Sequence, residues 1–197
     1  MNKKTIIIIV VLAVIAIFTY TKYNGMVGIN EDTKTAWSKV ESEYERRSAL
    51  IGNLVKTVQG AADYEKSTLE AVINARAKAT STQINVDDIT PENMAKFQQA
   101  QAGLSGALSK LLVSVERYPD LKANQSFLKL QDELASTENS VRTARNRYSE
   151  QANKLNKHIK TFPNNLFASM FGFKEMARFK AAAGSENAPD VEFDFNK

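Results

Sequence analysis

The sequence predicts an all-α fold, an antiparallel bundle of three to four long helices that follows an N-terminal transmembrane helix. Apolar residues recur at alternating spacings of three and four along most of the chain, which is the period of one helix face. Only 8 Gly and 4 Pro interrupt the 197 residues, so the elements are few and long. An unbroken apolar run, Ile6 to Phe18, stands close behind the N-terminus.

The N-terminal segment has the length of a short membrane span. Lys3 and Lys4 precede seventeen uncharged residues, which end before Lys22. As a helix these residues extend about 25 Å, near the lower limit for crossing a bilayer. Snorkelling lysines and interfacial tyrosines, Tyr20 and Tyr23, can make up the difference. We therefore predict a short tail over residues 1–4 and a single-pass transmembrane anchor over residues 5–22.

Two alternatives compete with an uncleaved anchor. A cleaved signal peptide needs small residues before the cut, whereas Thr-Tyr-Thr-Lys-Tyr follows Phe18. A buried core helix needs a polar face, which thirteen consecutive apolar residues do not leave. Lysines flank the segment on both sides, so the positive-inside bias is small. The short tail favours a signal-anchor whose tail is cytoplasmic and whose remaining chain is mostly extracytoplasmic.

A heptad follows the anchor. Its first set of positions, seven apart, is Trp37, Tyr44, Ile51 and Val58, and the intervening set is Val40, Arg47, Leu54 and Ala61. Extended toward the N-terminus, the heptad places two polar residues, Asn30 and Thr33, on the apolar stripe. The transmembrane helix therefore either continues through this polar patch as one helix, or it ends and a new helix begins with Asn30 as its cap. Gly60 favours a break. Residues 62–81 carry an apolar face of Leu69, Val72 and Ile73, and they form either a separate helix or a continuation of the one before Gly60.

Two more long helices and a short one are predicted after a polar loop from Thr80 to Pro91. Thr90 caps the first, with Pro91 at its first position; its stripe is Met94, Phe97, Gln101, Leu104, Leu108, Leu111, Val115 and Tyr118, and Pro119 ends it. Asn124 caps the second, whose stripe is Phe127, Leu130, Leu134, Thr137, Val141, Ala144, Tyr148, Leu155, Ile159 and Phe162. Residues 167–183 are predicted as a short amphipathic helix carrying Phe171, Phe173, Met176 and Phe179. The helical bundle thus covers residues 23–183, and residues 184–197 form a flexible C-terminal tail.

Composition argues against several functional classes. The 26 basic and 22 acidic residues are interspersed, which is typical of solvated helix faces and not of a nucleic-acid interface. The chain has no Cys and a single His, His158, so it lacks disulfides, thiol catalysis and paired Glu-x-x-His metal motifs. We expect no enzyme activity, no catalytic or metal site and no cofactor. Gly103 and Gly106 are interpreted as permitting close helix packing.

Arg47 is the most informative residue, because a charge at a core-facing heptad position is costly unless it is paired. One hypothesis is an ion pair with a carboxylate of the last long helix, with Glu138 the best candidate; the other is that local geometry turns Arg47 outward. Glu138 is also spaced to pair with Arg142 within its own helix. Trp37 and the other stripe aromatics are interpreted as core.

Several blocks of the sequence resemble the bacterial LemA family. The most specific are Tyr118-Pro119-Asp120-Leu121-Lys122-Ala123-Asn124 and Thr137-Glu138-Asn139, with Trp37-Ser38-Lys39-Val40 and Arg46-Arg47 before them. The sequence departs from the family pattern at Gly52, where proline is common, and at Ser48, where aspartate is common. The resemblance implies a membrane-anchored, mostly helical bundle and no defined reaction. It adds Tyr118, Pro119, Asn124 and Asn139 to Trp37, Arg47 and Glu138 as structural or interaction candidates.

The favoured function is a scaffold or adaptor in the bacterial inner membrane that presents a helical bundle to protein partners. One alternative is a lipid-surface or membrane-remodelling protein that uses the segment from Phe167 to Phe179. The other is a carboxylate-based metal protein or enzyme, for which the acidic residues are not grouped. The heptads can seal one chain's bundle or join several chains into a homo-oligomer.

Overall fold

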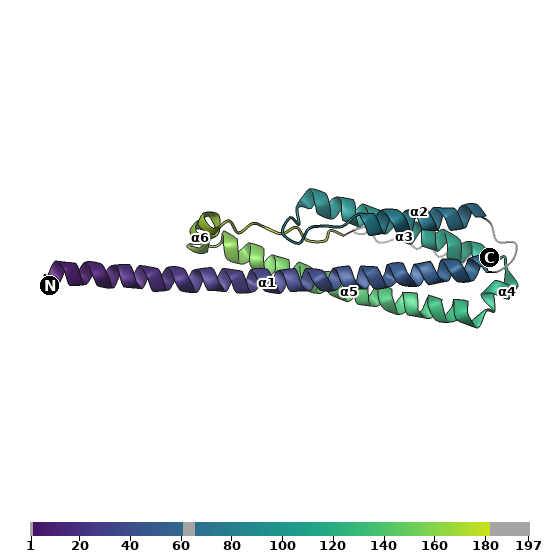
Figure 1. The fold of residues 1–197 in the computed structure, drawn as a ribbon, viewed down its shortest axis with the longest axis horizontal. Helices are drawn as coiled ribbons and strands as arrows, with labels where there is room; N and C mark the ends of the chain where they lie inside the picture. Colours follow the sequence, from purple (N-terminus) through teal and green to yellow (C-terminus); the bar gives the residue numbers. More distant parts are fainter. Residues whose placement is uncertain (1, 61–65, 182–197) are drawn as a thin grey trace, which may run out of the picture.

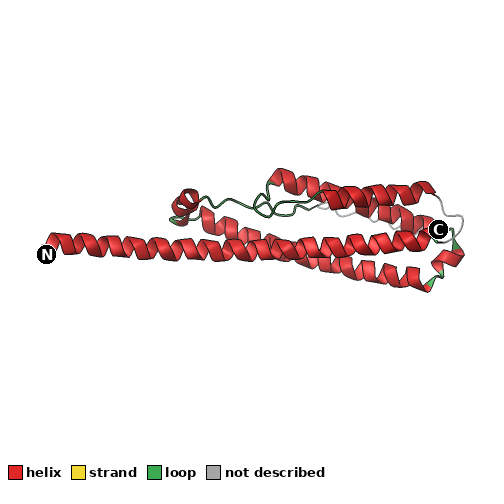
Figure 2. Ribbon diagram, viewed as in Figure 1, coloured by secondary structure: helices red, strands yellow, loops and turns green. Residues whose placement is uncertain are grey.

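The computed structural model describes residues 2–60 and 66–181, and these residues form helices and loops without a strand (Figure 2). The helices are α1 (Lys3–Gln59), α2 (Lys66–Ser81), α3 (Pro91–Val115), α4 (Pro119–Lys122), α5 (Gln125–Lys160) and α6 (Asn164–Phe171). The predicted all-α class is confirmed. The predicted tail 184–197, the heptad position Ala61 and residues 62–65 lie outside the described residues.

Helix α1 is one uninterrupted helix of 57 residues, about 85 Å long. Of the two alternatives for its polar patch, continuation is the one observed: Thr33 is buried and its hydroxyl donates to Ile29 O at 2.8 Å. The N-terminal part projects beyond the other helices (Figure 1). Ile6 to Phe18 are exposed, so the buried-core alternative for this run is wrong. This is the one helix among the described residues that is long and apolar enough to cross a membrane.

The bundle packs around the heptad face of α1. Helix α5 runs back along α1, while α2 and α3 pair beside them (Figure 1). The apolar core forms two clusters. One contains Trp37, Tyr148 and Leu155, and the other contains Ile51, Leu111 and Phe127. All seven described heptad positions of α1 are buried, which agrees with the heptad for the six apolar and aromatic residues and selects the inward orientation for Arg47.

The predicted caps are present. Thr90 Oγ1 accepts from Asn93 N at 3.2 Å, and Pro91 follows at the first helical position. Asn124 Oδ1 accepts from Ser126 N and Phe127 N at 2.9 and 3.2 Å. Helix α2 is a helix separate from α1, because α1 ends at Gln59 with Gly60 as its cap.

Some details of the stripes were wrong. Ile73 is 41% exposed and Phe162 is 80% exposed, because each lies where no helix covers its face. Helix α3 ends at Val115, and Pro119 instead begins the single turn of α4. A Cβ added at Gly103 or Gly106 would meet no atom within 4 Å, so these glycines do not mark a close helix contact.

The predicted helix over residues 167–183 is present only as far as Phe171, within α6, and residues 182–183 lie outside the described residues. Gly172 adopts a left-handed conformation, φ 76°, and ends α6. Residues 173–181, the C-terminal strap, then run in extended form along the bundle. The strap is held by tertiary hydrogen bonds: Met176 N donates to Asn156 Oδ1 at 3.0 Å, Asn156 Nδ2 donates to Met176 O at 2.9 Å, and Ala177 N donates to Ile89 O at 2.8 Å. These hydrogen bonds satisfy backbone groups that a helix would have paired within the segment.

Candidate functional site

Arg47 points into the bundle, and of its two predicted orientations the inward, paired one is present. The residue is 3% exposed. Its Nη1 donates to Glu138 Oε1 of α5 at 2.9 Å and to Ser105 Oγ of α3 at 3.3 Å. Its Nη2 donates to Gln101 Oε1 of α3. The guanidinium thus joins three helices at one point.

The contacts of this network extend further. Gln101 Nε2 donates to Ala79 O at the end of α2, at 3.5 Å, and the Arg47 guanidinium carbon lies 4.9 Å from the centre of the Tyr44 ring. Along the heptad, Arg47 lies between Tyr44 of one apolar cluster and Ile51 of the other. A buried cation needs such partners, since losing one leaves an uncompensated charge. The network therefore fixes how α1, α3 and α5 align at the boundary between the two clusters.

Trp37 anchors the cluster nearer the N-terminal half of α1. It is fully buried, with ring centroids 5.0 Å from Tyr148, 5.5 Å from Phe97 and 6.0 Å from Phe179. Tyr148 donates its hydroxyl to Ala177 O of the strap at 2.8 Å, and burial raises the pKa of this phenol. The strap residue Phe179 stacks on Trp37, so the strap completes the core. The interpretation of Trp37 as a core residue agrees with this packing.

A groove of about 470 Å³ opens between α1, α2 and α3 beside the Arg47 network; we call it the α1–α2–α3 groove. Its lining includes Glu41, Tyr44, Glu45, Ser48, Arg76 and Gln101. Glu41 and Glu45 stand one helical turn apart, and partial burial raises the pKa of the Glu41 carboxyl. Arg76 Nε donates to Ser48 O at 2.8 Å and packs against Gly52, where a Cβ would come within 3.3 Å of its guanidinium. The groove thus presents two carboxylates beside a fixed cation.

The remaining predicted candidates lie elsewhere. Tyr118, Pro119 and Asn124 shape the connection from α3 through α4 to α5, at the end of the bundle remote from the N-terminus (Figure 1). Asn139 follows Glu138 in α5, but its side chain is exposed and the structure does not bring it into the Arg47 network. All four residues thus lie outside the Arg47 network.

The contacts of Gln101 and Ser105 with Arg47, and of Phe179 with Trp37, were not predicted from the sequence. Gln101 did carry a signal, because it is the one amide in an otherwise apolar stripe of α3 up to Val115. A polar residue in one stripe and a charge in another are candidates to meet. Ser105 lies off the stripe and carried no comparable signal. Phe179 was predicted on an amphipathic helix, and nothing in that pattern indicated that it would stack on Trp37.

No cluster of three or more His, Cys, Asp or Glu side chains capable of holding a metal occurs in residues 2–60 and 66–181. His158 lies at the end of α5, with its Nε2 3.5 Å from Asn164 Nδ2. The lining of the α1–α2–α3 groove instead brings a fixed cation, Arg76, together with two carboxylates, Glu41 and Glu45.

The sequence is similar to those of known proteins. A model of the LemA family matches residues 36–193. Magnetosome protein MamQ 2 of Paramagnetospirillum magneticum is 26% identical over 194 residues, covering 89% of this chain and 71% of that protein. Protein LemA of Metamycoplasma hominis is 25% identical over 183 residues, covering 91% and 80%. Magnetosome protein MamQ of Magnetospirillum gryphiswaldense is 27% identical over 188 residues, covering 86% and 69%.

Proposed function

Because the chain belongs to the LemA family, we propose that it is a single-pass, membrane-anchored scaffold that presents its helical bundle to protein partners without catalysing a reaction. The observation that supports this most is the continuity of α1. The same helix carries the exposed apolar run Ile6–Phe18 and, from Met26 onward, the buried face of the bundle. A bundle built on its own anchor holds a bound partner at a fixed height above the membrane.

Anchoring through residues 5–22 fits the physical character of this segment. Its large aliphatic side chains from Ile6 to Ile17 are between 44% and 64% exposed, which water disfavours and a bilayer core favours. The proposed location is the bacterial inner membrane, with the tail in the cytoplasm and the bundle outside it. The domain limits follow: tail 1–4, anchor 5–22, bundle 23–183 and tail 184–197.

The α1–α2–α3 groove is the proposed docking surface. Glu45 is exposed, and together with Glu41 it offers two carboxylates to a basic side chain of a partner. The Arg47 network behind the groove fixes the helices that form its walls. A partner that presents Lys or Arg on a helix or loop suits this surface.

The test is crosslinking and pull-down of the tagged full-length protein from native membranes. Three variants are compared with it: a form lacking residues 1–22, Glu45→Lys in the groove, and Asp132→Lys as a matched charge reversal at an exposed position of α5. We expect defined proteins to be captured by the full-length protein and by Asp132→Lys, and to be lost without the anchor and with Glu45→Lys. Equal capture by all four would contradict the proposal.

Orientation is tested separately. The chain has no Cys, so a single Val113→Cys, exposed on α3, reports where the bundle lies. A membrane-impermeant maleimide should label it in intact cells from which an outer membrane is absent or has been made permeable. Labelling only after the inner membrane is opened would place the bundle in the cytoplasm.

A further inference from the structure

Helix α6 has a buried face and an exposed apolar face. Asn164 and Ala168, one turn apart, are buried against the bundle. Leu166 and Met170, also one turn apart, are 60% and 63% exposed. The helical period places the second pair opposite the first. Phe162, in the turn before α6, is 80% exposed. A cluster of large apolar side chains on one short element marks a surface that contacts something other than water.

Aromatic contacts fix the position of α6 along α1. Phe167 lies 5.9 Å from Phe18, and Phe171 lies 4.9 Å from Tyr23, both edge to face. Phe18 ends the unbroken apolar run, and Tyr23 follows the first lysine after it. Helix α6 is therefore level with the place where the proposed span ends.

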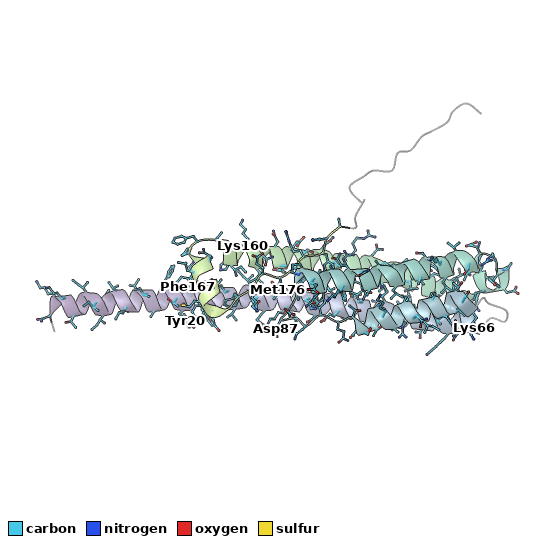
Figure 3. The ribbon with its side chains drawn as sticks, turned by 90° about the horizontal axis from the view of Figure 1, so that it is seen from above. Tyr20, Lys66, Asp87, Lys160, Phe167 and Met176 are labelled. Carbon is cyan, nitrogen blue, oxygen red and sulfur yellow. The ribbon has the colours of Figure 1, made fainter. Side chains whose placement is uncertain are left out.

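The orientation of α6 matches this level. The helix is viewed nearly end-on in Figure 1 and runs crosswise to α1 in Figure 3, where Phe167 is seen beside the part of α1 that carries Tyr20. A bilayer crossed by α1 thus has its surface parallel to α6. Asn164 and Ala168 are buried and Ala168 belongs to the core cluster, so the opposite pair, Leu166 and Met170, faces away from the bundle, toward the proposed bilayer.

Basic residues flank α6 in the chain. Lys154, Lys157 and Lys160 precede it, and Lys174 follows it. Lys160 Nζ lies 2.7 Å from Glu175 Oε2, so one of these lysines is paired. Lys22 Nζ lies 5.4 Å from the centre of the Phe18 ring at the same level of α1. An apolar helix face flanked by lysines is typical of helices that lie flat in the headgroup region of anionic membranes.

We propose that α6 and Phe162 form a second membrane contact, an interfacial helix that lies in the headgroup layer around the exit of α1 and inserts Leu166 and Met170 toward the acyl chains of an anionic bilayer. This inference rests on the proposed anchoring of residues 5–22. This second contact would hold the membrane-proximal end of the bundle against the bilayer surface and thereby set the tilt of α1. The strap is not part of this contact, because its Met176 and Phe179 pack into the core.

The test uses full-length protein in vesicles of phosphatidylcholine and phosphatidylglycerol. Single cysteines, Val11→Cys in the span, Met170→Cys in α6 and Val113→Cys on α3, each carry an environment-sensitive fluorophore. Val113 is the matched control, since it is 72% exposed and apolar but remote from α6. Quenching is measured with aqueous iodide and with nitroxide-bearing lipids. Leu166→Cys repeats the measurement on the same face as Met170.

We expect the labels at residues 11, 166 and 170 to be quenched by the nitroxide lipids. Their iodide quenching should be several-fold weaker than at residue 113. If residue 11 is quenched by lipid while 166 and 170 behave like 113, the anchor stands and the interfacial helix is refuted. If 166 and 170 are shielded from both quenchers, a second copy of the chain covers α6, which also overturns the proposal. Strong iodide quenching of the label at residue 11 would refute the anchoring of residues 5–22 itself.

Discussion

Neutralising Glu138 tests the central ion pair with little change of shape. Glu138→Gln keeps the side-chain length but removes the charge that faces Arg47. A hydrogen bond to a charged group contributes about 1.5–3 kcal/mol. The Glu138 side chain is 44% exposed, so water offsets part of this, and we expect a loss of about 1–2 kcal/mol. For a chain of this size that corresponds to a fall of about 2–8 °C in the unfolding temperature.

A double-mutant cycle isolates the pair. Arg47→Met keeps the apolar stem while removing the guanidinium. In that background Glu138→Gln should cost almost nothing, giving a coupling energy of about 1–2 kcal/mol. Arg47→Ala adds a cavity and should cost about 2–5 kcal/mol. The assay is thermal unfolding of the full-length protein in detergent, followed by circular dichroism.

Two results would refute this reasoning. Equal costs of Glu138→Gln in both backgrounds would mean that the two side chains do not interact in solution. An unchanged unfolding temperature for Arg47→Ala would mean that the guanidinium is not held by the bundle. A smaller Glu138→Gln effect at high salt is expected, because half-exposed pairs are screened.

Four further predictions concern other parts of the bundle. Asn124→Ala should lower stability by about 0.5–2 kcal/mol through loss of the α5 cap, while Asn124→Asp retains most of it in the same unfolding assay. Gly106→Ala should raise stability by about 0.8–1 kcal/mol, because the added methyl meets nothing; a decrease would show a contact at this position. Phe179→Ala should cost about 1–3 kcal/mol and increase hydrogen exchange at the strap amides, whereas unchanged exchange would mean that stacking on Trp37 does not hold the strap. Burial raises the pKa of Glu41 in the folded state, so its ionisation disfavours folding. Glu41→Gln should therefore stabilise at neutral pH, and titrated unfolding should show this advantage shrinking as pH falls toward 4.5, the ordinary value for this carboxyl, and absent below it.

Helical period predicted the residues that face inward because the core of a bundle is built from one stripe per helix. The heptad through Trp37 and Ile51 and the caps Thr90 and Asn124 are local patterns, and each is present in the structure. The helical period alone does not show where an apolar stripe is no longer covered by a neighbouring helix. Phe162 continues the α5 spacing but lies beyond its last residue, Lys160, so it is exposed.

Other features depend on residues far apart in the chain. The heptad left two orientations for Arg47, because the choice depends on Gln101 and Glu138 arriving from α3 and α5. The strap could not be predicted as extended, since its order comes from hydrogen bonds to Asn156 and Ile89 and not from its own sequence.

The Arg47 network and the proposed membrane contact are connected through the register of α5. A shift of α5 by one turn along α1 would move Glu138 by about 5.4 Å and leave Arg47 buried without its carboxylate. The same shift would carry α6, which follows α5 after a short turn, away from Phe18 and Tyr23. The ion pair therefore disfavours the alignments in which α6 would miss the end of the apolar run. The Arg47–Glu138 ion pair contributes only modestly to the free energy of unfolding. It nevertheless helps to place the apolar face of α6 at the level where the proposed span leaves the bilayer.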